Sequence, residues 1–215
     1  MISEIKNFFI NFFRKKNSNI FDYVTFIKNM KKQKKGLMSK KQYLRIAKKL
    51  SEISPCNLLV FGLGDDSYLW SKINNKGKTI FLEDSKDWIA SVNDGTLDVE
   101  HVVYQTSVEN QKDIGFIPEK LEFSIPNRVS DLTYDFIIVD APLGHQPPRP
   151  FKGPGRMSSI YMAFKLLKKG GVVVIDDMGR PIEKQYAFHY FKEENLIDFI
   201  EKKVGIFQNP DKNSQ

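Results

Sequence analysis

The chain has 215 residues, of which 41% are hydrophobic and 27% are charged. This length and apolar content predict one globular domain with a sizeable core, and they exclude disordered, collagen-like and coiled-coil classes. The formal net charge is +7, but residues 1–50 hold 14 Lys or Arg and only two acids, so the remainder is mildly acidic. We therefore expect a basic N-terminal segment, residues 1–41, ahead of an acidic domain.

Cysteine content and hydropathy bear on the compartment. Cys56 is the only cysteine, which excludes a disulfide within the chain and a cysteine-based metal cluster, and suits a reducing compartment. No apolar run approaches the roughly 20 residues that cross a bilayer, and the order of segments in a signal peptide is missing. We therefore expect a cytoplasmic protein, with peripheral membrane contact as a further expectation for its basic segment.

The basic segment has two features. In residues 1–16, Ile and Phe recur at helical spacing and the stretch ends in three basic residues, which predicts an amphipathic helix. Packing on the domain or on a dimer partner is favoured over insertion into a membrane surface. The Lys-rich residues 28–41 predict a solvated linker or helix end, with contact to a phosphate-rich partner as the alternative. Ser39 is the predicted N-cap of a helix over residues 40–53.

From residue 57 onward, short apolar runs alternate with helical stretches. The predicted strands cover residues 58–61, 78–82, 99–105, 135–139 and 172–175. The predicted helices cover residues 67–73, 157–168 and 182–191, with another through Trp88 and Val92. Continuously apolar runs are typical of strands buried on both faces of a mostly parallel sheet. We therefore predict a doubly wound α/β domain over residues 42–208, closed by an antiparallel hairpin (196–200 and 204–208), and a disordered tail over residues 209–215.

Glycines and an acid follow the first two predicted strands, where ligands bind in such sheets. Gly62 and Gly64 leave room for a cofactor near the backbone, and Glu83, 21 residues after Gly62, is placed to accept both hydroxyls of a ribose. Asp65 and Asp66 would repel a pyrophosphate but are compatible with the sulfonium cation of S-adenosylmethionine. The sequence thus favours S-adenosylmethionine over a nicotinamide dinucleotide, with N-capping of the next helix as the alternative role of one aspartate.

Several blocks stand in order along the chain. They are residues 54–70, 79–84, 103–106, 134–142, 154–157 with 160–161, and 180 with 183–184 and 186–187. Together these blocks resemble the plant glucuronoxylan 4-O-methyltransferase family, and the resemblance runs from about residue 44 to residue 207. It implies a Rossmann-like class I methyltransferase that uses S-adenosylmethionine. The implied acceptor is a sugar hydroxyl, the 4-O position of glucuronic acid in a glycan.

The resemblance also implies roles for individual residues. The implied cofactor contacts are Gly62, Gly64, Asp66, Ser67, Glu83, Asp84, Thr106 and Asp140. The chain departs from the family at Asp65 and Asp176, where the family has histidines. These departures bear on the acceptor, while methyl transfer stays the expected reaction.

Three aspartates follow the fourth and fifth predicted strands. Asp140, Asp176 and Asp177 should converge at one edge of the sheet, where their oxygens would suit Mg²⁺ or Mn²⁺. A sugar hydroxyl is a weak acid, so its attack on a methyl group needs a metal or a base. In the alternative, one aspartate, Asp140 or Asp177, is the base, and His145 is the second candidate for that role.

A stiff loop rich in Pro and Gly, residues 141–157, is a predicted lid over the strand ends. Arg149 and Arg156 in this loop, together with Arg180, are predicted to bind a uronate carboxylate. Two other functions stay open. One is a metal-dependent O-methyltransferase of a small hydroxylated molecule; the other is a membrane-surface or nucleic-acid binding protein that uses the basic segment, with nucleic acid the less favoured partner.

Overall fold

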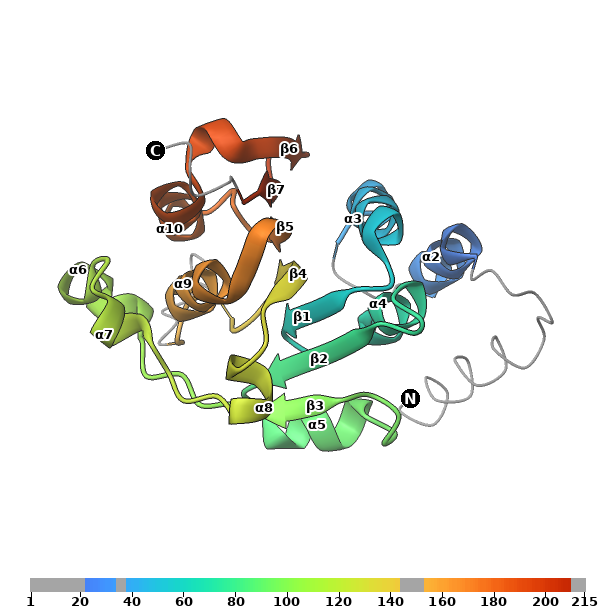
Figure 1. Ribbon diagram of the computed structural model, residues 1–215, viewed down its shortest axis with the longest axis horizontal. Coiled ribbons are helices and arrows are strands. Elements are labelled where there is room, and N and C mark those ends of the chain that lie inside the picture. Colours follow the sequence, from blue (N-terminus) through green and yellow to red (C-terminus); the bar gives the residue numbers. More distant parts are fainter. Residues whose placement is uncertain (1–21, 34–37, 144–152, 210–215) are drawn as a thin grey trace.

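The computed structural model describes residues 22–33, 38–143 and 153–209. A seven-stranded sheet in the order β3-β2-β1-β4-β5-β7-β6 forms its centre (Figure 1). The strands are β1 (Asn57–Phe61), β2 (Lys78–Glu83), β3 (Val99–His101), β4 (Tyr134–Val139), β5 (Leu167–Ile175), β6 (Leu196–Ile200) and β7 (Val204–Gln208). The first five strands are parallel, and β7 runs antiparallel to both β5 and β6. The predicted doubly wound sheet with a C-terminal antiparallel hairpin is confirmed.

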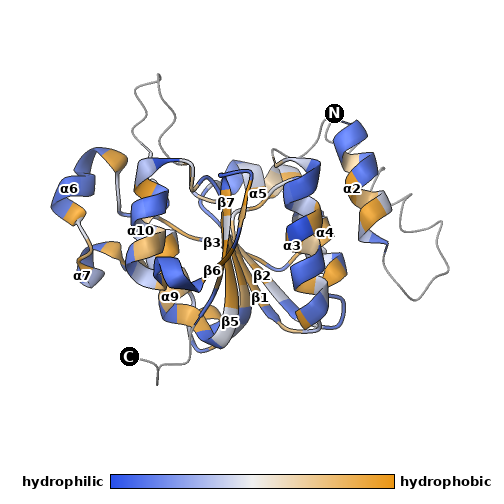
Figure 2. Cartoon of the chain, turned by 90° about the horizontal axis from the view of Figure 1, so that it is seen from above, coloured by the Kyte–Doolittle hydropathy of each residue, from blue (hydrophilic) through white to orange (hydrophobic). Residues whose placement is uncertain are grey.

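The core lies on both faces of this sheet because successive side chains of a strand point to opposite sides. In β1, Leu59 and Phe61 join one apolar cluster while Leu58 and Val60 join the other, and all four are buried. Figure 2 shows the sheet edge-on between two helical layers. One layer contains α6 (Gln111–Ile114), α7 (Pro118–Leu121), α9 (Met157–Leu166) and α10 (Pro181–Phe191); α8 (Asn127–Ser130) also packs into this cluster. The other contains α2 (Tyr23–Lys32), α3 (Lys40–Ile53) and α4 (Ser67–Ile73), with α5 (Lys86–Val92) at its edge.

Helix α2 packs as part of the domain. Residues 28–32, for which a linker or a helix end was expected, continue this helix to Lys32. Its Phe26, Ile27 and Met30 are fully buried in the cluster that also contains apolar residues of α3 and α4. The amphipathic helix predicted for residues 1–16 lies outside the described residues, as do residues 210–215 of the predicted tail.

The predicted N-cap of α3 is confirmed. The Ser39 hydroxyl accepts a hydrogen bond from the Gln42 amide at 3.1 Å, and the Gln42 side chain accepts one from the Ser39 amide at 2.7 Å. This reciprocal pair is a capping box, and it satisfies two amides that the first helical turn leaves unpaired.

Two strand boundaries differ from the prediction by more than one residue. The third strand was expected over residues 99–105 but ends at His101, because β3 is an edge strand that pairs only with the last residues of β2. The fifth strand was expected from residue 172 but begins at Leu167, since Leu167 already pairs with Tyr134 of β4 before a shift in register. Across the described ranges, no helix is both long and apolar enough to cross a membrane.

Candidate functional site

The candidate site lies at the carboxyl ends of the central strands. The chain leaves β1 toward β2 on one side and later returns to β4 on the other, so a crevice is expected between the ends of β1 and β4. Backbone hydrogen bonds between neighbouring strands align these ends at one level. The Gly62 amide donates to Leu82 (2.8 Å), the Asp140 amide to Phe61 (3.0 Å) and the Asp176 amide to Val139 (3.0 Å). The predicted site residues after β1, β4 and β5 therefore lie together at the carboxyl ends of these strands.

Gly62 makes the turn after β1 and must be glycine. Its φ of +115° is a conformation that other residues rarely adopt, and a Cβ there would lie 2.9 Å from the Cβ of Ala141. The turn therefore brings the backbone of β1 against the segment after β4 without an intervening side chain.

Glu83 ends β2 and is only 6% exposed. Its Oε2 accepts a hydrogen bond from the Leu63 amide (3.0 Å) and its Oε1 accepts one from the Ser85 amide (2.9 Å). Burial raises the pKa of this carboxyl, and the two amide bonds partly offset that rise. Each oxygen keeps further acceptor capacity, because a carboxylate offers about four lone-pair sites. The pair of oxygens therefore fits the two hydroxyls of a ribose.

Asp66 and Ser67 begin α4. Asp66 occupies the N-cap position, but its side chain makes no capping hydrogen bond. The Ser67 hydroxyl instead accepts a hydrogen bond from the Gly64 amide at 2.9 Å and fixes the glycine turn. Burial raises the pKa of Asp66 to about 6, although hydrogen bonding from Tyr43 and Trp70 lowers it. An anionic Asp66 beside this turn is compatible with a cationic cofactor and not with a phosphate.

Two further predicted cofactor residues, Asp84 and Thr106, follow β2 and β3. Asp84 directly follows Glu83 and is half-buried, and its carbonyl oxygen lies 3.2 Å from the His101 ring. Thr106 is buried, and its hydroxyl donates to the carbonyl of Pro154 at 2.9 Å. Thr106 thus ties the segment after β3 to the segment that leads into α9.

Acidic and basic side chains meet after β4 and β5 in a group that we call the acid cluster. Its members are Asp140, Arg156, Asp176, Asp177, Arg180, Glu183 and Lys203. Four carboxylates face three cations there, which leaves one negative charge uncompensated. Asp177 has a φ of +61°, a left-handed conformation that aspartate tolerates better than most residues.

Arg156 lies at the centre of the acid cluster. Its Nη2 is 3.1 Å from both Asp140 Oδ1 and Asp177 Oδ2, and its Nη1 is 3.8 Å from Asp176 Oδ2. Its Nε donates to the Pro142 carbonyl at 3.2 Å, and the residue is only 4% exposed. The guanidinium is thus already paired with Asp140 and Asp177, and its predicted contact with an acceptor stays a prediction.

Two further cations complete the acid cluster. Arg180 Nη2 lies 2.8 Å from Asp177, and its Nη1 lies 3.5 Å from Glu183. Lys203, from the turn between β6 and β7, lies 3.5 Å from Asp176 and 3.4 Å from Asp177. Neither Glu183 nor Lys203 was among the predicted site residues. Lys203 carries no local signal, since only the hairpin fold brings it to the end of β5.

The three aspartates lie together around Arg156, and the divalent ion predicted among them stays a prediction. Resident cations already pair with these aspartates, and Arg156 would repel a metal ion placed among the carboxylates. Within the described part of the chain, no group of three or more His, Cys, Asp or Glu side chains is arranged to hold a metal.

Unpaired polar atoms concentrate in the acid cluster. Among the described residues, four buried side-chain atoms make no hydrogen bond: Arg156 Nη1, Asp176 Oδ1, Arg180 Nη1 and Glu183 Oε2. Buried polar groups are nearly always hydrogen-bonded, and exceptions are typical of sites that bind a ligand or water. His145 and Arg149, the other predicted residues of this region, lie outside the described residues.

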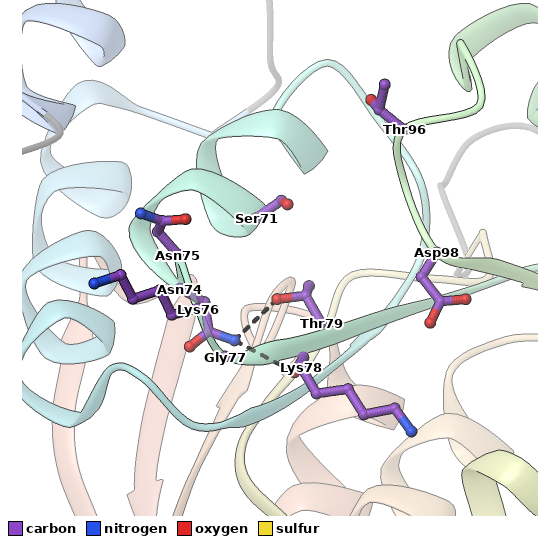
Figure 3. Close-up of a pocket in the computed structure, with 9 residues that line it drawn as sticks. All are labelled: Ser71, Asn74, Asn75, Lys76, Gly77, Lys78, Thr79, Thr96 and Asp98. Atoms are coloured by element: carbon purple, nitrogen blue, oxygen red, sulfur yellow. Dashed lines mark hydrogen bonds between the residues drawn. The ribbon is translucent and has the colours of Figure 1, made fainter. Parts of the chain in front are cut away.

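A pocket of about 360 Å³ opens at the other end of β2, away from Glu83 (Figure 3). Ser71, Asn74, Lys78 and Thr96 are among the residues that line it. The Asn74 amide nitrogen donates to the Cys56 carbonyl (3.0 Å) and to the Thr79 hydroxyl (2.9 Å), so this side chain holds the chain together rather than facing a ligand.

The sequence matches the IRX15/IRX15L/GXM family over residues 42–120 and 119–206. Glucuronoxylan 4-O-methyltransferase 3 of Arabidopsis thaliana is 36% identical over 173 residues, which are 68% of this chain and 57% of that protein. Arabinogalactan O-methyltransferase 1 of Arabidopsis thaliana is 32% identical over 164 residues, 64% of this chain and 55% of that protein. The chain spans about half the length of the curated relatives it matches.

Solved structures share the fold at low sequence identity. The MycE methyltransferase of the mycinamycin biosynthetic pathway, in complex with Mg, SAH and mycinamycin VI, aligns with a TM-score of 0.55 at 14% identity. The alignment covers 92% of this chain and 57% of that one. The T. thermophilus 16S rRNA N2 G1207 methyltransferase aligns with a TM-score of 0.50 at 14% identity, covering 81% of this chain and 44% of that one. The fold is therefore the Rossmann-like fold of class I methyltransferases.

Proposed function

The chain belongs to the IRX15/IRX15L/GXM family, and from this membership we propose that it is an S-adenosylmethionine-dependent O-methyltransferase of a polysaccharide. The finer proposal is the 4-O position of glucuronic acid, which relatives named glucuronoxylan 4-O-methyltransferase support. One observation carries the proposal: the Gly62 turn, the buried Glu83 and Asp140 stand together at the carboxyl ends of neighbouring strands.

The cofactor half of the site lies at the carboxyl ends of β1 and β2. Glu83 accepts hydrogen bonds from the two ribose hydroxyls. Its carboxylate oxygens keep acceptor capacity for them beyond the hydrogen bonds from the Leu63 and Ser85 amides. The Gly62 turn lets the ligand approach the backbone, and Asp66 supplies negative charge beside it. When bound, S-adenosylmethionine supplies a methyl group on a positively charged sulfur, and this charge suits the acid excess of the site.

Asp140 is the proposed general base. Its side chain is 34% exposed, so a hydroxyl can reach the carboxylate. Burial raises the pKa of Asp140 well above its ordinary value; Arg156 lowers it, and Asp176 and Asp66 raise it further. A carboxylate with a raised pKa is a stronger proton acceptor than an ordinary one. Asp140 would accept the proton that the sugar hydroxyl loses when the hydroxyl oxygen bonds to the methyl carbon, the sulfur–carbon bond breaks and the sulfur leaves as a neutral thioether. Asp177 is less suited to this role, since its Oδ2 is already paired with two arginines.

Arg180 is the proposed contact for the uronate carboxylate. Its side chain is 20% exposed, in contrast to Arg156, and its Nη1 makes no hydrogen bond within the described residues. A partly exposed guanidinium at this position is suited to a planar carboxylate. Arg149 stays a second proposed contact.

The cofactor assignment is tested with Glu83→Gln. Glutamine keeps the size but loses the charge and one acceptor, so we expect the Kd for S-adenosylmethionine to rise roughly tenfold or more, as for loss of a charged hydrogen bond. Isothermal titration calorimetry measures this, and Glu119→Gln, an exposed site on α7, is the matched control. Equal affinities of Glu83→Gln and wild type would remove the assigned ribose contact.

The acceptor is tested by a product screen. The purified chain is incubated with S-adenosylmethionine in three separate reactions. The acceptors in these reactions are glucuronoxylan, arabinogalactan and a catechol, in that order. We expect 4-O-methylglucuronic acid in the first reaction, identified by mass spectrometry and NMR of the hydrolysed product. Methyl transfer to the catechol alone would overturn the assignment to a sugar hydroxyl.

A further inference from the structure

Arg156 links the two strand ends that carry the proposed base and its neighbours. It is the N-cap residue of α9 and follows directly on the segment after β4. From there its guanidinium reaches Asp140 and the Pro142 carbonyl on one side, and Asp176 and Asp177 on the other. A single buried side chain therefore bridges the ends of β4 and β5.

The charges of the acid cluster explain why a cation is needed there. Three aspartates and Glu183 come together in a largely buried space, where uncompensated carboxylates would repel one another strongly. Arg180 and Lys203 contact Asp177 and Asp176, but the ion pairs described for Asp140 include neither of them. In the described structure, the ion pair of Asp140 is with Arg156.

We propose that Arg156 is the resident cation of this site: its guanidinium occupies the position among Asp140, Asp176 and Asp177 that a divalent metal would otherwise take, and it holds Asp140 toward the acceptor. Arg156 is thus a positioning residue. Its planar fork fixes several carboxylates at once, which a flexible ammonium group does less well. The effect on catalysis rests on the proposed function, whereas the effect on metal binding does not.

The first test measures metal binding by the full chain. Mn²⁺ is titrated into wild type, Arg156→Gln and the exposed control Lys165→Met, and free Mn²⁺ is followed by electron paramagnetic resonance. We expect no specific Mn²⁺ binding by wild type or by the control. Removal of the cation should raise the affinity of Arg156→Gln for Mn²⁺ by roughly tenfold or more, because three carboxylates lose a positive neighbour. Stoichiometric Mn²⁺ binding by wild type would overturn the proposal, and that outcome does not depend on whether the variant folds.

The second test asks whether Arg156 positions the base. Asp140 faces Arg156, Asp66, Asp176 and Tyr43, and Arg156 is the cation that lowers its pKa. The acid limb of the pH profile of kcat should therefore move to higher pH in Arg156→Gln and be largely restored in Arg156→Lys. Lys203→Met removes a charge from the same cluster without removing a contact to Asp140, so its acid limb should stay near that of wild type. Equal shifts in Lys203→Met and Arg156→Gln would contradict a specific role.

The two proposals fail in distinguishable ways. If wild type binds S-adenosylmethionine but methylates no glycan, the proposed acceptor fails while the Mn²⁺ titration still tests Arg156. If wild type methylates a glycan and a chelator abolishes that activity, the proposed function stands and the inference about Arg156 is overturned.

Discussion

At the scale of single residues, Asp66 is a carboxylate whose burial lowers stability at neutral pH. A half-buried aspartate with a pKa of about 6 is harder to ionise in the folded protein than in the unfolded chain. The folded state therefore holds a proton between about pH 4 and pH 6 that the unfolded state has released. Stability contributed by this group falls as pH rises through that window and stays lower above it. The negative charge of Asp66 would favour binding of a cationic cofactor at the proposed site. This benefit to binding accounts for the loss of stability.

Asp66→Asn should remove this pH dependence. Asparagine resembles the protonated aspartate, so we expect the variant to match wild type near pH 4 and to be more stable at pH 7, by on the order of 2 kcal/mol. Urea unfolding at a series of pH values measures the difference, with Asp113→Asn, exposed on α6, as the control. A difference between wild type and Asp66→Asn that does not change with pH would contradict the raised pKa.

At the scale of elements, α2 shows that a helix next to a basic stretch can still be structural. Its N-cap Asp22 accepts a hydrogen bond from the Thr25 amide at 3.0 Å, and Lys31 Nζ donates to the Met38 carbonyl at 2.8 Å. Its apolar face is buried with the neighbouring helices, whereas Lys28 and Lys32 are exposed. The alternation of Lys with Phe, Ile and Met in this stretch is therefore amphipathic patterning toward the core.

Phe26→Ala tests whether α2 contributes to the fold. Phe26 is fully buried, so we expect its truncation to lower the free energy of unfolding by about 3–5 kcal/mol. Val24, in the same helix, is 38% exposed, and Val24→Ala should cost less than about 1 kcal/mol. Chemical denaturation followed by circular dichroism measures both. Equal and small losses in the two variants would mean that α2 does not support the domain.

At the scale of the whole molecule, two apolar clusters share one sheet. Ile137 and Ile138 are adjacent in β4 but belong to different clusters, one on each face. Both clusters include residues from the central strands, and strand ladders join the whole sheet. The two helical layers should therefore unfold together rather than one after the other.

Ile137→Val and Ile138→Val test this cooperativity. Each removes one buried methyl group, so each should lower stability by about 1 kcal/mol with an unchanged dependence on denaturant. Tryptophan fluorescence reports the face where Trp70 is buried, and far-ultraviolet circular dichroism reports both layers. The two signals should give one midpoint in both variants. If fluorescence responds to Ile138→Val but not to Ile137→Val, the layers unfold separately.

The sequence by itself determined the sheet and the place of the site. Buried parallel strands have continuous apolar runs, and their carboxyl ends meet at one edge, so the Gly62 turn, Glu83 and the three aspartates could be placed from local patterns alone. Only the tertiary structure decided how the charges pair. Arg156 is buried among the aspartates, and Lys203 reaches them from a hairpin turn, because side-chain direction and contacts between distant segments depend on packing. The same reason applies to α2, whose basic composition is evident in the sequence while its burial depends on the helices it meets.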